Sequence, residues 1–451
     1  MPQCFSGAAA KSTQDVGVRE QKEVASLEDL PTLEPLAHAT PQGFLGKTFS
    51  SLRHANYRYL WFGTVFMSAG QWIQQVTLGW LLYDLTGSSV LLGALNGLRA
   101  LPFLIASPIA GVVADRTDRK KILTATQYVL MTTTVAMGFL VALKLVAVWH
   151  LFAFTLITAI AWAFTDPVRQ SMVPTLVPKE DLINAVALNS AAFNMTKVIG
   201  PSVGGLLIVA FGAAGNFFVQ GAAYAAVLLS IYWMVIPPAP TEAKRSSALA
   251  NLKEGLLYIW SNPTVFALLT AALVPRICAM PYQILMPVFQ KDVLKVGPEG
   301  LGIMLAAPGL GAMLAGLLLA SLAHRVQRQG VLMLSSLIAL GIAMNMFSWT
   351  TSFPLAILAL VNIGAFQIFY MATTNTMLQV IVPDHLRGRV MSIYALDRGL
   401  MPIGALTAGV SAHWIGAPAT VSYMGFAVIV MAGLVAWRAP VVRRLGVSLN
   451  G

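Results

Sequence analysis

The sequence has few charged residues and almost no cysteine. Only 10% of its 451 residues are Asp, Glu, Lys or Arg, whereas a typical soluble domain has about 25%. Its two cysteines, Cys4 and Cys278, are too few for a disulfide framework. These shortages exclude an ordinary soluble domain and a small disulfide-stabilised one.

Motifs for catalysis, metal binding and nucleotide binding are also lacking. No His/Cys cluster has the spacing of a metal site, and Gly46-Lys47-Thr48 follows Pro41 where a phosphate-binding loop needs its first glycine. We therefore expect no enzyme activity, no cofactor and no metal. The net charge is +11, but its basic residues lie in short segments between apolar runs. That pattern is typical of membrane topology, so we expect no nucleic-acid partner.

Apolar residues, in contrast, are abundant. They make up 57% of the chain, and the mean hydropathy is +0.71. Runs of about 20 apolar residues can cross the hydrocarbon core of a bilayer as helices. We predict an all-α integral membrane protein with twelve transmembrane helices in two six-helix halves. The predicted spans are 59–84, 88–113, 123–147, 150–173, 185–210, 215–236, 264–289, 300–322, 331–349, 354–381, 390–414 and 418–437.

The stretches between and outside these runs divide the chain. Residues 1–45 are polar, mixed in charge and without a signal-peptide core, so we predict a disordered cytoplasmic tail. The longest connection is a central cytoplasmic loop over 237–262, which begins Pro237-Pro238-Ala239-Pro240. It separates an N-terminal half over 46–236 from a C-terminal half over 263–438. Residues 439–451 then form a second tail.

The basic residues predict the orientation of the chain. Most of the 29 Lys and Arg residues lie in the tails and in the loops on their side, while the opposite loops hold only Lys144, Lys291 and Lys295. Cytoplasmic loops are enriched in Lys and Arg. We therefore predict a multi-pass protein of the cell (inner) membrane with both termini in the cytoplasm.

The two halves repeat each other. Leu92-Gly93 recurs 209 residues later as Leu301-Gly302, and the same offset aligns 114–119 with 323–328. Repeats in the same orientation are the trace of duplicated halves with a substrate path between them. This pattern indicates a transporter.

Two motifs resemble those of the major facilitator superfamily. The segment 111–121 reads GVVADRTDRKK, which is similar to the signature loop Gly-x-x-x-Asp-Arg-x-Gly-Arg-Arg/Lys. The segment 200–205 reads GPSVGG and resembles the Gly-Pro-x-x-Gly-Gly element of exporters in that superfamily. Two further stretches, WLLYDLTG at 80–87 and DPVRQ at 166–170, look like the branch that includes the enterobactin exporter. The resemblance covers residues 50–440 and implies a major facilitator fold.

The resemblance also implies a conformational latch in the signature loop. Its residues are Gly111, Asp115, Arg116 and Arg119, and the aspartate would hold the two halves together on the cytoplasmic side. Asp118 stands where the family has glycine; aspartate tolerates a left-handed turn, so the turn can survive. The alternative is that these charges only set the orientation. For the exporter element (Gly200, Pro201, Gly204 and Gly205), the alternative is ordinary close helix packing.

Cations inside the predicted helices indicate a cavity. Arg99, Lys197 and Arg276 each lie about midway along a predicted span, where a charge facing lipid costs about 2.5–3.5 kcal/mol. They should line a water-filled cavity, which favours an anionic cargo, or pair within the bundle. The polar residues that we predict to join them in the cavity are Gln71, Gln75, Asn96, Asn375 and Gln379.

We predict a secondary active transporter, specifically a proton-coupled exporter of a small organic molecule that works as a monomer in the bilayer. Siderophore-like acids and drug-like compounds are the expected cargoes. Asp397, beside Arg398 within a predicted helix, is the candidate proton carrier. An importer or lipid-type facilitator on the same fold is the alternative, and a non-transporting receptor or scaffold is less favoured because it needs no charges inside its helices.

Overall fold

The computed structural model describes residues 48–235, 248–322, 328–395 and 400–444. Within these ranges the side chains of 103–116 and 248–253, and a few single ones, are not described. The predicted tail over 1–45, Asp397 and Arg398 lie outside the described residues. Residues Ser50–Gly451 form one compact unit.

Every regular element in the described residues is helical. The first five long helices are α2 (Ala55–Thr86), α3 (Ser89–Arg116), α4 (Arg119–Ala142), α5 (Val148–Leu176) and α6 (Leu182–Trp233). The later ones are α7 (Ala248–Ser261), α8 (Pro263–Cys278), α9 (Met286–Val288), α10 (Pro298–Leu322), α11 (Gln329–Trp349), α12 (Phe353–Ile381), α13 (Asp384–Ala395), α14 (Met401–Ile415), α15 (Ala417–Arg438) and α16 (Pro440–Arg444). Short turns η3 (Ser50–Arg53), η4 (Lys179–Asp181), η5 (Met280–Leu285) and η6 (Phe289–Val293) connect them.

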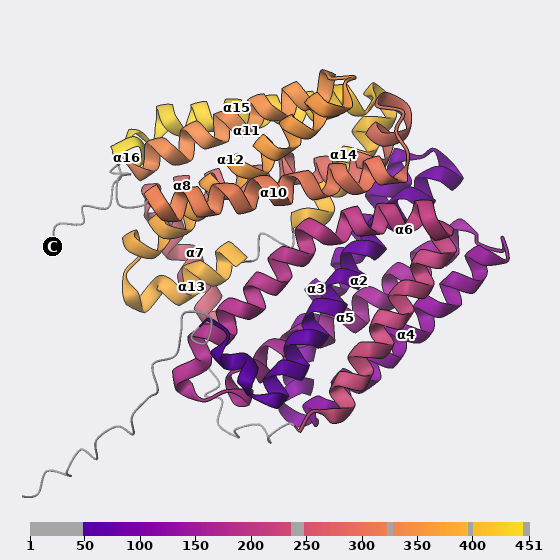
Figure 1. The fold of residues 1–451 in the computed structure, drawn as a ribbon. Helices are drawn as coiled ribbons and strands as arrows, with labels where there is room; N and C mark the ends of the chain where they lie inside the picture. The colour runs from indigo at the N-terminus through magenta and orange to yellow at the C-terminus, as the bar shows by residue number, and fades with distance from the viewer. Residues whose placement is uncertain (1–47, 236–247, 323–327, 396–399, 445–451) are drawn as a thin grey trace, which may run out of the picture. The chain divides into compact units, whose positions relative to one another are not determined.

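The helices pack in two groups. Helices α2 to α6 contact one another extensively, as do α10, α11, α12 and α15, and Figure 1 shows the two groups by their indigo-to-magenta and orange-to-yellow colours. We call α2–α6 the first half and α8–α15 the second half. The main contacts between the halves are those of α6 with α10 and of α3 with α14.

Individual residues define where helices end. Helix α2 ends at Gly87, whose φ of 60° is left-handed, and α6 bends at Gly212, with φ 71° and ψ 177°, so that it consists of two helical arms. Glycine adopts positive φ without a steric cost. The Asp118 side chain accepts a hydrogen bond from the Lys120 amide at 2.8 Å and caps α4. Because φ of Asp118 is −57°, the expected left-handed turn is wrong; the aspartate serves as a helix cap instead.

Exposed tryptophans mark two levels on the bundle. Trp149, Trp349 and Trp414 lie at one end and are 66%, 67% and 80% exposed. At the opposite end Trp233 and Trp437 are 55% and 71% exposed. Tryptophan is enriched at both water–membrane interfaces. We call the first level the Asp84 end, after the residue near the end of α2, and the second the Arg119 end.

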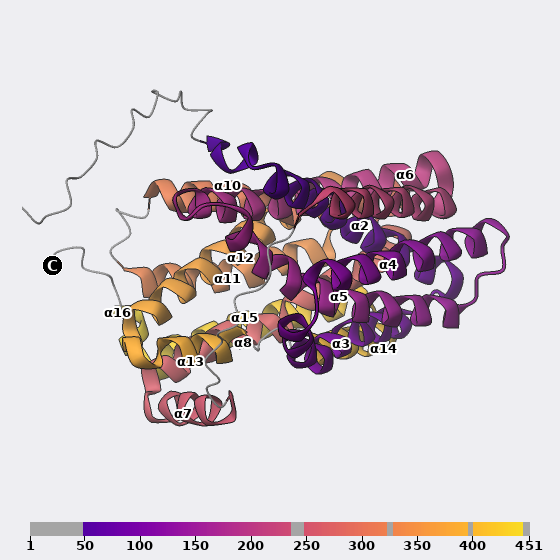
Figure 2. The ribbon, with the colours of Figure 1, turned by 90° about the horizontal axis from the view of Figure 1, so that it is seen from below.

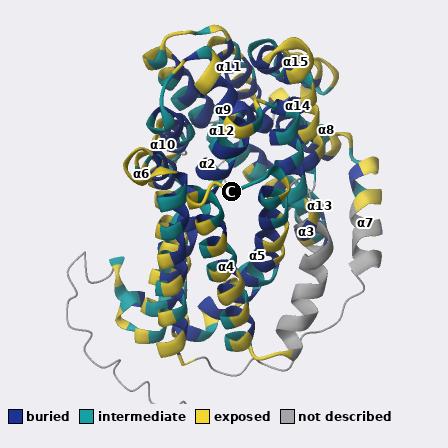
Figure 3. Ribbon diagram, turned by 90° about the vertical axis from the view of Figure 1, so that its right-hand side faces the viewer, coloured by how far each residue is buried: buried dark blue, intermediate teal, exposed yellow. Residues whose placement is uncertain are grey.

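The surface between the two levels is apolar. Exposed side chains there include Phe211, Leu317 and Val430, and eight described helical segments are long and apolar enough to cross a membrane. Figure 3 shows exposed residues along the outer helices and buried residues within the bundle. The chain is therefore a multi-pass membrane protein.

Candidate functional site: a polar cavity between the halves

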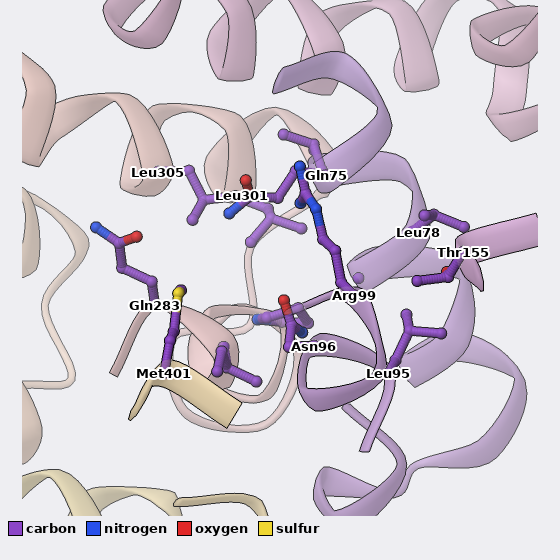
Figure 4. Close-up of a pocket in the computed structure, with 14 residues that line it drawn as sticks. Gln75, Leu78, Leu95, Asn96, Arg99, Thr155, Gln283, Leu301, Leu305 and Met401 are labelled. Atoms are coloured by element: carbon purple, nitrogen blue, oxygen red, sulfur yellow. The ribbon is translucent and has the colours of Figure 1, made fainter. Parts of the chain in front are cut away.

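A small cavity of about 50 Å³ lies between the two halves. Its polar lining comes from Gln75 on α2, Asn96 and Arg99 on α3, Thr155 on α5, and Gln283 on η5. Leu301, Leu305 and Met401 add apolar surface from the second half. Figure 4 shows Arg99 extended toward Gln75, with Gln283 across the cavity. Both halves thus contribute polar groups to one chamber.

Arg99 is the cation of this cavity. It follows the start of α3 at Ser89 by ten residues, which at about 1.5 Å per residue puts it near the middle of the bilayer. No ion pair among the described residues includes Arg99, although its charge interacts with the buried Tyr224. Arg99 thus lies in the cavity lining without an ion pair among the described residues.

Lys197 lines a smaller adjoining cavity. The two cavities share Gln75 and Gln283 in their lining. Lys197 and Arg276 lie close enough for their charges to interact, although they belong to different halves. The cation-rich region therefore extends from α3 through α6 to α8.

Trp72 adds a hydrogen-bond donor to the second cavity. Its indole Nε1 is buried and has no acceptor among the described residues, and its side chain lines the cavity beside Lys197. A buried donor without a partner is costly. The walls thus offer donors (the indole, an ammonium and a guanidinium) that fit a ligand rich in acceptor oxygens.

The predicted cavity residues do not all meet there. Gln75, Asn96, Arg99 and Lys197 line the two cavities, and the Asn96 amide also donates to the Leu92 carbonyl of its own helix at 2.9 Å. Half-buried Gln71, Arg276, Asn375 and the exposed Gln379 are outside these linings. Asn375 and Gln379 bond to each other at 3.2 Å on α12.

Neighbouring glutamines on α2 have different roles. Gln75 faces the cavity, whereas Gln74 is buried and its amide donates to Thr158 at 3.3 Å. The Gln220 amide donates to the Gln74 carbonyl oxygen at 2.8 Å and to the Gly70 carbonyl at 3.0 Å. This network holds α2, α5 and α6 together.

The glycines of the exporter element bring α6 close to two neighbours. A Cβ atom on Gly200 would lie 2.7 Å from Cβ of Trp72, and one on Gly204 would lie 3.2 Å from Cα of Ile73, so both positions pack against α2. A Cβ on Gly205 would lie 2.6 Å from the Pro298 carbonyl oxygen of α10. Pro201 is buried within α6 and also lines the smaller cavity.

Two glycine pairs close the cavity at the Asp84 end. Gly205 on α6 faces Gly302 on α10, and Gly93 on α3 faces Gly409 on α14. A Cβ on any of these four would lie 2.5–2.6 Å from the carbonyl oxygen four residues before its partner. Gly93 and Gly302 are the glycines of the internal repeat. The two junctions therefore have the same geometry, as duplicated halves require.

The signature loop is only partly described. Gly111, Asp115 and Arg116 fall within the backbone of α3, but their side chains are not described. Arg119 begins α4, and its Nη1 donates to the Ser171 carbonyl of α5 at 3.4 Å. This arginine therefore connects helices of the first half to each other.

The sequence does not predict a buried arginine and an ion pair between the halves. Arg169 on α5 is only 9% exposed, and its Nη1 donates to the Thr64 hydroxyl at 2.8 Å. It occurs in the DPVRQ stretch, which from the sequence is only a family signature. At the Asp84 end, Lys291 pairs with Asp84 at 2.9 Å. From the sequence, this lysine indicates only the topology.

A bundle of apolar helices with a polar cavity between two matched halves defines a membrane transporter. Residues 46–445 match the model of a family described as transmembrane secretion effectors. The chain belongs to this family, which lies within the major facilitator superfamily, and the expected family resemblance is confirmed.

Relatives and solved structures agree with this assignment. The chain is 26% identical to the staphyloferrin A transporter of Staphylococcus aureus over 82% of this chain and 93% of the relative. It is also 26% identical to the multidrug efflux pump Tap of Mycolicibacterium fortuitum, over 86% and 96% of the two chains. A crystal structure of the nucleoside transporter NupG, in a point-mutant form, superimposes with a TM-score of 0.69 at 14% identity, over 84% of this chain and 99% of that one. The last comparison shows the fold.

Proposed function

We propose that the protein exports small organic molecules that carry acidic groups, by alternating access of the cavity to the two sides of the membrane. The observation that carries this proposal is the chamber itself, where Arg99 and Lys197 face a space built from both halves. A mid-membrane cation needs an aqueous or anionic environment. An acidic cargo supplies that environment while it is bound.

The direction of transport is proposed from relatives. One relative is named a multidrug efflux pump and another a staphyloferrin A transporter. To test it, inverted membrane vesicles from cells that produce the protein should accumulate a fluorescent aromatic carboxylate when the vesicle interior is acidified. Equal accumulation without the protein would contradict transport, and accumulation only in right-side-out vesicles would identify an importer.

Export against a gradient requires energy, and we propose that protons supply it. Asp397, beside Arg398, remains the candidate carrier on sequence grounds. The Asp397→Asn variant should still bind cargo but lose the response of transport to an imposed pH gradient. A variant that keeps proton-driven export would eliminate Asp397 from this role.

For the architecture we propose twelve crossings. The twelve would be the eight apolar segments and four further crossings. These four are α2, α3, the second arm of α6, and α13 together with α14. The proposed units are the halves over 46–236 and 263–438, the tails and the loop over 237–262, with the protein acting as a monomer. Reporter fusions after Lys121, Lys244 and Arg444 should report cytoplasm and fusions near Lys144 and Lys295 the outside. A cytoplasmic signal at Lys295 would contradict the proposal.

A further inference from the structure

Helix α7 lies at the edge of the second half. It packs beside α13, as Figure 2 shows from below and Figure 3 from the side. The Asn262 side chain follows α7 directly and accepts hydrogen bonds from the amides of Thr264 at 3.1 Å and Val265 at 3.2 Å. This cap fixes the corner at which α7 meets the membrane-spanning helix α8.

One face of α7 is apolar and open. Leu256, Leu257 and Trp260 are 41%, 60% and 73% exposed, and helical spacing puts them on one side. Glu254 and Ser261, also exposed, lie about 160° and 140° around the helix from Leu256. A helix with an open apolar face beside a polar one is typical of the membrane interface.

The apolar face continues into the lipid-facing surface of α8. The rings of Trp260 and Phe266 lie 5.3 Å apart, and Phe266 is itself 42% exposed on α8. Trp260 belongs to the same end of the bundle as Trp233 and Trp437, which mark the Arg119 level. The bilayer that covers α8 therefore also reaches the open face of α7.

A polar contact fixes the rotation of α7 about its axis. Glu254 forms an ion pair with Arg389 of α13, and Ile259 is buried, 5% exposed, against the second half. With these two positions turned toward protein, Leu257 and Trp260 turn away from it.

We propose that α7 is an interfacial helix whose Leu256, Leu257 and Trp260 insert among the lipid headgroups at the Arg119 end. The bilayer surface is the partner of this face. This inference concerns a surface remote from the cavity and does not depend on which cargo is carried or in which direction.

Nitroxide labels on two faces of α7 test the proposal. Leu256→Cys and the matched control Ser261→Cys, about 140° apart around the helix, are made in a background without Cys4 and Cys278, then reconstituted in phosphatidylcholine vesicles. The label at 256 should collide with oxygen, which concentrates in the bilayer, and be protected from a water-soluble nickel chelate, whereas the label at 261 should show the reverse. Equal nickel accessibility at both positions would overturn the proposal.

A second variant distinguishes bilayer contact from protein packing. Adding Trp260→Glu to the Leu256→Cys protein should lower the oxygen-to-nickel accessibility ratio at 256 several-fold. Glu254→Gln, which leaves the apolar face intact, should keep the ratio high. If Trp260→Glu leaves the ratio unchanged, protein rather than lipid shields position 256 and the proposal is wrong. A poorly folding Leu256→Cys protein is replaced by Trp260→Cys, with Leu256→Glu as the added substitution and the same expected results.

Discussion

The Tyr83 hydroxyl donates a hydrogen bond to the carboxylate of Asp292, and the two residues stand 209 positions apart, the offset that relates the halves. Their neighbours Asp84 and Lys291 form an ion pair at 2.9 Å. Two consecutive residues at the end of α2 therefore contact two consecutive residues of the π-helical turn η6 in the other half. We call these two contacts the clasp. The clasp and the glycine junctions lie at the same end of the bundle.

The clasp makes a prediction about its two members. A hydrogen bond to a charged group contributes about 1.5–3 kcal/mol, with partial exposure favouring the lower value, whereas an exposed ion pair contributes about 0–1 kcal/mol. Tyr83→Phe should therefore shift the balance toward states open at the Asp84 end by about tenfold. Asp84→Asn, which removes an ion pair between side chains that are 48% and 46% exposed, should shift it less.

Distances between the halves measure this shift. Spin labels at Leu145 and Thr351, in exposed loops of different halves at the Asp84 end, should show a larger long-distance population in Tyr83→Phe than in Asp84→Asn. The reverse order would mean that the ion pair, not the hydrogen bond, dominates the clasp.

The glycine junctions predict a different kind of defect. An alanine Cβ at position 302 would lie 2.5 Å from the Pro201 carbonyl oxygen and 3.1 Å from Cα of Gly205, so α6 and α10 would have to separate. Overpacking costs about 1–3 kcal/mol. Gly302→Ala should lower the thermal midpoint in detergent and widen the same spin-label distance.

Helix α10 supplies the control for this substitution. A Cβ on Gly316 would meet nothing within 4 Å, and alanine is favoured over glycine in a helix by about 1 kcal/mol. Gly316→Ala should therefore be neutral or stabilising. Equal losses in the two variants would assign the defect to the helix rather than to the junction.

The sequence predicts the eight apolar helical segments because long apolar runs have one stable form in a bilayer. It does not predict that the expected span 264–289 is interrupted after Cys278 by the turn η5. It also predicts the repeat, and Gly93 and Gly302 were singled out by it. It does not predict that Gly93 faces Gly409 or that Gly302 faces Gly205. The residues of each pair are distant in the chain, so only the tertiary packing of the helices brings them together.

The candidate site was predictable in part. Mid-helix charge located Arg99 and Lys197, because burial of an unpaired cation is costly whatever surrounds it. Gln74 and Gln75 carry the same functional group one residue apart, and only the packing of α5 and α6 decides that the first is structural. Gln283 lies in a broken segment between α8 and α9, where helical periodicity gives no direction.

A cluster at the Arg119 end makes a prediction about pH. Asp181 accepts hydrogen bonds from the Ser50 hydroxyl at 2.6 Å and from His54 at 2.8 Å, which lower the pKa of its carboxyl from the ordinary 3.8. Because the folded pKa is below the unfolded one, this stabilisation is present above pH 3.8 and is lost as the pH falls through the folded pKa.

Thermal unfolding across pH 3–6, a range about the ordinary pKa of an aspartate, checks this prediction. Asp181→Asn should be less stable than the wild type at the upper end, and the difference should shrink as the solution is acidified. Glu180→Gln, at an exposed neighbouring position, should match the wild type throughout. A gap between Asp181→Asn and wild type that stays constant would assign the effect to packing rather than to charge.

The cavity cations make the prediction closest to function. Arg99→Gln and Lys197→Gln keep polar side chains in the linings while each removes one charge, and they should impair transport of an aromatic carboxylate more than that of its neutral methyl ester. A charge-assisted hydrogen bond is about twice as strong as a neutral one, so we expect about a tenfold loss for the acid and a much smaller one for the ester.

Asn96→Ala, a change to an uncharged lining residue, should affect both compounds alike. Uptake rates in vesicles, normalised to the amount of folded protein, measure the three ratios. Equal losses of acid and ester in both charge variants would mean that Arg99 and Lys197 hold the halves together rather than select the cargo.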